Sequence, residues 1–209
     1  MVVAAVVVLS ACSGSGEGKS KDRGDAPQGW SVCNELFGSS RIDALQAELG
    51  DGTLEPLNST PVSELMSGRA GVAKSWKPGS EVHYANTAHP CDLGIDGTSA
   101  RFNSYVRWSV DTPEDIENGV ASRDGWQSTG GDVHVVREDA GLHLTAVFPC
   151  KIKGSHQDQE AELPLEVETE VRNVPGFDAD LLSEMTARLA SVLAKGLPCA
   201  NSPRIPEAL

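Results

Sequence analysis

Sequence patterns that mark the common enzyme classes are absent from this chain of 209 residues. It has no Gly-x-Ser-x-Gly, Ser-x-x-Lys, His-Glu-x-x-His or phosphate-loop pattern, so the usual signatures of hydrolases and nucleotide-binding proteins are missing. Basic clusters are also lacking after residue 28, and 17 basic residues stand against 30 acidic ones, for a formal net charge of −13. Nucleic-acid binding needs a basic footprint that releases counterions, so we exclude that class of partner.

Aromatic residues are scarce, at 5% of the chain. This is too few to favour the stacking platforms of sugar-binding modules, and we interpret Trp76, Trp108 and Trp126 as core or rim residues. No Cys-x-x-Cys pair occurs, which argues against structural zinc. No calcium-loop spacing of acids is present either. We therefore expect no metal and no cofactor.

A hydrophobic run long enough to cross a bilayer is missing at the N-terminus, where the apolar stretch 1–9 is too short for a membrane helix. The stretch ends in Leu9-Ser10-Ala11-Cys12, which resembles a bacterial lipobox. That resemblance implies cleavage before Cys12 and acylation of its thiol, for example with palmitate, so that residues 1–11 are a signal peptide. The run lacks the Lys/Arg n-region of such a peptide, which predicts a start upstream of Met1.

Composition changes again after Cys12. Residues 12–28 are rich in Gly, Ser, Lys and Asp and hold few apolar side chains, so we expect an acylated cysteine followed by a flexible tether. Residues 29–209 are the right length for a single domain with an adequate core. The four cysteines of this domain form an even set in an exported chain, which predicts two disulfides with three possible connectivities among Cys33, Cys91, Cys150 and Cys199.

Helices are predicted by apolar periodicity and by caps. We expect a helix starting at a Ser40 cap and ending before Gly50, a second over Val62 to Ala73, and a short one from Thr112 to about Val120. Asp178 is expected to cap a long apolar helix that ends at Gly196.

Strands are predicted by alternation of apolar and polar residues. The segments are Glu81 to Tyr84, Arg101 to Val110, a hairpin of Asp132 to Arg137 with Leu142 to Phe148, and Leu163 to Val171. We place the hairpin at the centre of the sheet. Because no βαβ rhythm occurs, the fold class expected is α+β, with a single antiparallel sheet and helices packed mainly on one face.

Several segments around the cysteines resemble a known group of proteins. They are Cys33-Asn34-Glu35-Leu36-Phe37, Glu48-Leu49-Gly50, Cys91-Asp92-Leu93, Pro149-Cys150 and Leu197-Pro198-Cys199. In this context the chain resembles small actinobacterial lipoproteins and sensor-like extracytoplasmic domains, most of which have no known function. The resemblance implies the disulfides Cys33–Cys91 and Cys150–Cys199.

Two groups of polar residues are candidate binding or metal sites. His134 and His143 could meet on the hairpin as metal ligands, but partly exposed strand histidines are the simpler interpretation. Glu166, Glu168 and Glu170 lie on the polar side of their strand, which predicts an acidic, water-exposed face that could bind a cationic partner. A glycosidase needs only two such carboxylates, so a hydrolase remains the alternative.

These observations favour a lipid-anchored domain at the extracytoplasmic face of the cell membrane. We expect a non-catalytic role, the binding of a small ligand or of another envelope protein, with no catalytic residue assigned. One alternative is a cell-envelope hydrolase using the clustered carboxylates, which a raised carboxyl pKa in a pocket would favour. Another is a carrier of an apolar molecule, which a deep apolar cavity would favour.

Overall fold

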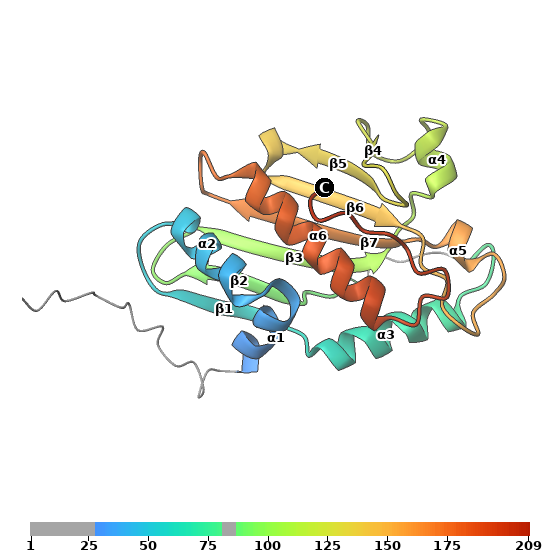
Figure 1. The fold of residues 1–209 in the computed structure, drawn as a ribbon, viewed down its shortest axis with the longest axis horizontal. Coiled ribbons are helices and arrows are strands. Elements are labelled where there is room, and N and C mark those ends of the chain that lie inside the picture. Colours follow the sequence, from blue (N-terminus) through green and yellow to red (C-terminus); the bar gives the residue numbers. More distant parts are fainter. Residues whose placement is uncertain (1–27, 81–86) are drawn as a thin grey trace, which may run out of the picture.

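The computed structural model describes residues 28–80 and 87–209. The segments expected as signal peptide and acylated Cys12, almost all of the expected tether, and the strand expected at 81–84 lie outside the described residues. Within them, seven strands form one antiparallel sheet in the order β1-β2-β3-β7-β6-β5-β4 (Figure 1). The expected α+β class with one antiparallel sheet is confirmed.

The strands match most of the alternating segments. Their bounds are β1 Leu54–Ser59, β2 Cys91–Ile95, β3 Arg101–Trp108, β4 Gln127–Ser128, β5 His134–Glu138, β6 His143–Phe148 and β7 Leu165–Arg172. The expected hairpin is present as β5 and β6, but its placement at the centre of the sheet was wrong, because β7 is the middle strand. The strand β7 pairs along its length with both β3 and β6, so it is hydrogen-bonded on two sides.

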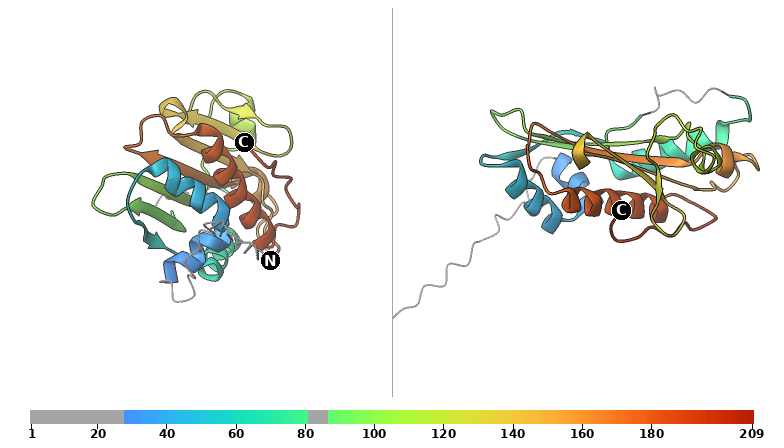
Figure 2. Two further views of the ribbon diagram at one scale, coloured as in Figure 1. Left: turned by 60° about the vertical axis from the view of Figure 1, so that its left-hand side comes forward. Right: turned by 90° about the horizontal axis from the view of Figure 1, so that it is seen from above.

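Helices flank the sheet. Their bounds are α1 Gln28–Phe37, α2 Ser39–Leu49, α3 Val62–Ser75, α4 Pro113–Glu117, α5 Gln159–Glu162 and α6 Ala179–Gly196, with a 3₁₀ turn at Asp139–Gly141. Seen along the sheet, α1, α2 and α6 lie on one side of it (Figure 2). The expectation of helices mainly on one face is therefore confirmed.

The start of the first expected helix differs from the sequence pattern. Gly38, at a φ of 83°, separates α1 from α2, and the N-cap of α2 is Gly38 with no side-chain cap. The expected capping role of Ser40 was therefore wrong, because the chain turns two residues earlier, where glycine tolerates a positive φ. By contrast, Thr112 and Asp178 cap α4 and α6 as expected.

The core lies between the sheet and the helix layer. Its largest fully buried side chains include Phe37 from α1, Phe102 from β3 and Phe148 from β6, and the Phe37 and Phe102 rings meet edge to face at 5.3 Å. The disulfide Cys33–Cys91 joins α1 to β2, and Cys150–Cys199 joins the end of β6 to the segment after α6. Both predicted disulfides are confirmed.

Helix α3 follows β1 along one edge of the sheet (Figure 1). The Trp108 indole Nε1 donates to the carbonyl of Arg69 at 3.0 Å, and the Arg69 guanidinium donates to the carbonyl of Val106 at 3.4 Å. These two bonds hold the middle of α3 beside the end of β3. Among the described residues, no helix has the length and hydropathy of a membrane span.

Candidate functional site

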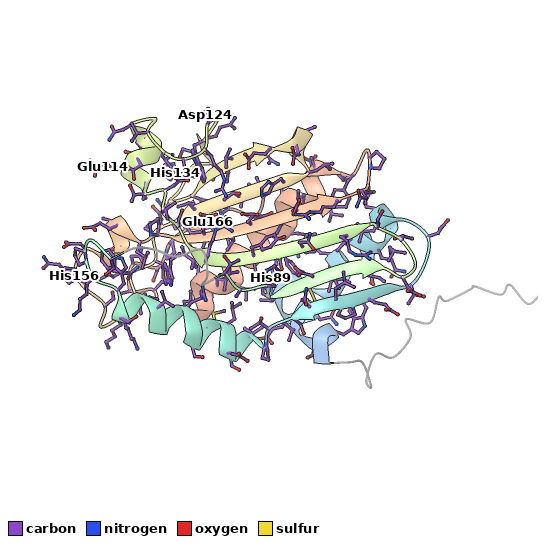
Figure 3. All side chains as sticks on the ribbon, turned by 180° about the vertical axis from the view of Figure 1, so that it is seen from behind. His89, Glu114, Asp124, His134, His156 and Glu166 are labelled. Atoms are coloured by element: carbon purple, nitrogen blue, oxygen red, sulfur yellow. A yellow bond between two sulfur atoms is a disulfide. The ribbon has the colours of Figure 1, made fainter. Side chains whose placement is uncertain are left out.

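The sheet face opposite α1, α2 and α6 carries the acids singled out in the sequence. Side chains alternate along β3 and β7, and the two strands pair Arg107 with Glu166 and Tyr105 with Glu168. Because directly paired residues share a face, the polar side chains of the two strands are neighbours. We call this surface the polar face; Figure 3 shows it from behind the helix layer, with Glu166 labelled.

Arg107 neutralises two of the acids. Its guanidinium pairs with the carboxylates of both Glu166 and Glu168. Glu166 is 3% exposed and Glu168 is 8% exposed, so both ion pairs are largely removed from water. Burial alone lowers the pKa of an arginine, but the two adjacent carboxylates outweigh it and raise the pKa of Arg107.

A second arginine reaches the same carboxylates from a loop. The Arg123 Nη1 lies 3.3 Å from Glu166 Oε1, and its Nη2 lies 3.5 Å from Glu168 Oε2. Near Glu166, Ser109 donates a 2.6 Å hydrogen bond to that carboxylate. The loop is itself fixed, because the buried Asp111 accepts bonds from the backbone and hydroxyl of Ser122.

His143 completes this arrangement from β6. Its Nε2 lies 3.0 Å from Glu168 Oε1, and its Nδ1 lies 3.4 Å from Glu138 Oε2. The bond to Glu168 raises the pKa of His143, against the effect of burial. Burial raises the pKa of Glu168, but the His143 hydrogen bond and the Arg107 charge outweigh it and lower that pKa to about 2.

The expectation of a water-exposed acidic face was therefore wrong for Glu166 and Glu168. The cations that neutralise these acids belong to the chain itself, on β3, on β6 and in the loop after α4. Glu170 is partly exposed and takes bonds from Arg172 at 2.5 Å and from the Tyr105 hydroxyl at 3.5 Å. Alternation along one strand shows which side chains share a face, but cross-strand partners depend on the strand order.

The histidine pair considered as a possible metal site does not form. His134 pairs with Val147 and His143 pairs with Glu138, so the two histidines lie at opposite ends of the hairpin. No group of three or more His, Cys, Asp or Glu side chains in the described part of the chain could hold a metal ion.

A hollow of about 610 Å³ lies beside the polar face, where the end of β1, α3 and the segment just before β2 meet. This volume is within the range of small-molecule sites. Its polar lining consists of Asn58, Ser59, Thr60, Glu64, Arg69, Thr87 and His89. Leu65, Gly68 and Ala88 form the rest of the lining. We call this site the His89 hollow.

The imidazole of His89 is oriented by a buried acid. Its Nδ1 lies 3.1 Å from Asp92 Oδ2, and the same carboxylate accepts from Asn58 Nδ2 at 3.0 Å and from the backbone of Ser104 at 2.9 Å. Asp92 is 3% exposed, whereas the His89 side chain is 46% exposed (Figure 3). The ring also contacts Tyr105 edge to face at 4.7 Å. A carboxylate on Nδ1 fixes the tautomer and leaves Nε2 for a bond to a ligand.

The sequence pattern assigns no binding role to His89 or Asp92. The sequence feature that could have indicated the site is a histidine, His89, three residues before an aspartate, Asp92, at the start of a strand. Asn58 comes from a distant segment and meets Asp92 only because β1 pairs with β2.

Comparison of the chain with protein-family models, with curated proteins and with solved structures finds no match.

Proposed function

We propose that this chain is a lipid-anchored domain at the extracytoplasmic face of the cell membrane, where it binds a small polar ligand without catalysis. The observation that carries the binding proposal is the His89 imidazole, held by the buried Asp92 at a hollow of about 610 Å³. The anchoring proposal rests on the lipobox resemblance at Cys12 and on the cysteine context shared with small actinobacterial lipoproteins. Two disulfides fit an oxidising, extracytoplasmic compartment.

The ligand class follows from the lining. Amide, hydroxyl, carboxylate and imidazole groups, from Asn58, Thr60, Glu64 and His89, offer both donors and acceptors, and the Arg69 guanidinium adds further donors. Leu65 of α3 and Ala88, which precedes β2, supply only part of the wall. A small molecule rich in hydroxyl or amide groups matches this set better than an apolar one.

The hydrolase alternative is less well supported. A general acid on the polar face needs a carboxyl pKa near the working pH, whereas that of Glu168 is about 2. Glu166 accepts bonds from Arg107, Arg123 and Ser109, so its oxygens already have partners. The carrier alternative needs an apolar cavity between sheet and helices, where fully buried side chains such as Phe37, Phe102 and Leu144 lie.

Two glycines of α3 allow a matched test of the hollow. A Cβ added at Gly68 or at Gly71 meets no atom within 4 Å, and only Gly68 lines the hollow. Gly68→Leu should therefore fill the hollow, while Gly71→Leu adds the same side chain to the same helix elsewhere. Both replace a helical glycine, so neither should lower the stability.

The test is mass spectrometry of small molecules that co-purify with the native, full-length protein. We expect a bound compound in the wild type and in Gly71→Leu, and its loss in Gly68→Leu and in His89→Ala. A compound retained by Gly68→Leu and His89→Ala would reject the hollow as the binding site. A wild-type protein with no bound compound would count against ligand binding altogether.

A further inference from the structure

Helix α6 presents one polar row on the side away from the core. Arg188, Ser191 and Lys195 are three and four residues apart, so they lie on one face with Ser191 a turn from each cation. Arg188 is partly exposed and Lys195 is exposed. The segment after α6 runs back along the helix (Figure 1), and its residues 205–208 line a common hollow with this row.

The returning segment and α6 enclose two adjoining hollows. One, of about 620 Å³, is lined by Arg41, Arg188, Ser191 and Lys195 together with Ile205 and its neighbours. The other, of about 550 Å³, shares Ser191, Lys195 and Ile205 with the first and adds Arg204. We call the two together the α6 groove.

Positive charge gathers in the α6 groove although the chain has 30 acidic and only 17 basic residues. Of its four cations, Arg41 lies 3.7 Å from Glu184 and Arg204 lies 3.9 Å from Asp132. Two acids, Glu184 and Glu207, also line the groove. Among the residues that the structure describes, neither Arg188 nor Lys195 has an ion-pair partner. Two unneutralised cations on either side of a hydroxyl point to an anionic ligand.

We propose that the α6 groove binds a phosphate group, placed over Ser191 between Arg188 and Lys195. A phosphate carries up to two charges and enough acceptor oxygens for a guanidinium, an ammonium and a hydroxyl at once, whereas a carboxylate has only two oxygens. The groove is larger than one phosphate, so the rest of the ligand lies along Ile205 and Pro206. The phosphate belongs either to a soluble phosphorylated compound or to a phospholipid headgroup.

The test compares two double variants of the full chain, each also carrying Cys12→Ala so that no lipid is attached. Arg188→Gln with Lys195→Gln removes the two cations of the groove. Lys74→Gln with Lys77→Gln removes the same charge at exposed positions of α3 and just after it. Binding of inorganic phosphate is followed through backbone amide shifts, and binding to vesicles of phosphatidylglycerol or phosphatidylcholine through sedimentation.

We expect phosphate to shift the amides around Ser191 in a saturable way, with at least about tenfold weaker binding in Arg188→Gln/Lys195→Gln and less than about twofold change in Lys74→Gln/Lys77→Gln. Exchanging the cations, Arg188→Lys with Lys195→Arg, should retain most of the binding. If sedimentation with phosphatidylglycerol vesicles falls only in the groove variant, the phosphate belongs to a lipid headgroup. If the protein binds inorganic phosphate but does not sediment with these vesicles, the ligand is a soluble phosphorylated compound. The absence of both, or an equal loss in the α3 control, would overturn the proposal.

Discussion

At the scale of single residues, the polar face is a set of mutually neutralising ions. Arg107, Arg123 and His143 surround the carboxylates of Glu166 and Glu168, and the two acids are nearly inaccessible to water. Removing one partner of an ion pair this buried lowers the stability of the fold, because water cannot solvate the charge that remains. The stability of the domain should therefore depend on each member of the set.

Arg107 is the member with the largest expected effect. Arg107→Ala leaves two buried carboxylates without their main cation and should lower the free energy of unfolding by about 3–5 kcal/mol. Arg172→Ala is a matched control, since Arg172 bonds Glu170 on the same strand but is 57% exposed and should cost less than about 1 kcal/mol. Urea unfolding of both variants measures the difference, and equal costs would contradict the description of these pairs as buried.

His143 and Glu168 make stability depend on pH in opposite directions. The pKa of Glu168 is lowered from 4.5 to about 2, so its contribution is present above pH 4.5 and is lost as pH falls toward 2. The pKa of His143 is raised above 6.5, so its contribution is full below pH 6.5 and is lost as pH rises through the raised value. From these two groups we expect maximal stability between about pH 4.5 and 6.5.

The histidine contribution is isolated by comparing the wild type with His143→Gln. The difference in their free energies of unfolding should be largest near pH 6 and should shrink toward pH 9, because neutral imidazole loses its charge interaction with Glu168 and Glu138. Chemical unfolding at a series of pH values measures it. A difference that stays constant over this range would show that His143 acts through packing alone.

At the scale of elements, helix caps and the alternation of apolar and polar residues predicted more of the structure than the charge patterns did. Thr112 and Asp178 cap their helices because their side chains accept hydrogen bonds from nearby backbone amides. Such local hydrogen bonds can be predicted from the sequence. Ser40 had the same pattern but lies inside α2, because Gly38 provides the turn. Neither the partners of Glu166 nor the meeting of Asn58 with Asp92 was predictable, because both depend on which strands pair.

Asp178 and Ser40 offer a direct comparison, because only Asp178 caps its helix. Asp178→Ala removes the acceptor for the backbone amide of Asp180 at the start of α6 and should cost about 1 kcal/mol. Ser40→Ala changes an exposed residue inside α2 and should stay within about 0.5 kcal/mol of the wild type. Thermal unfolding of the two variants checks this, and a larger loss for Ser40→Ala would restore Ser40 as the cap.

At the scale of the whole molecule, the two proposed binding surfaces lie on opposite sides of one sheet. The His89 hollow adjoins the polar face, whereas the α6 groove belongs to the helix layer, so each can be altered without touching the other. The proposed anchor at Cys12 precedes α1, the first element described, by a segment rich in Gly and Ser.

The measurement that tests anchoring and export most directly is the intact mass of the native protein extracted from its own membrane, compared with Cys12→Ala. The proposal predicts a chain that begins at Cys12, carries acyl groups there, and gains the mass of four thiol hydrogens on reduction. Cys12→Ala should remain unprocessed and carry no acyl group, because acylation requires the thiol. A native chain that retains residues 1–11 and has no acyl group would contradict the account.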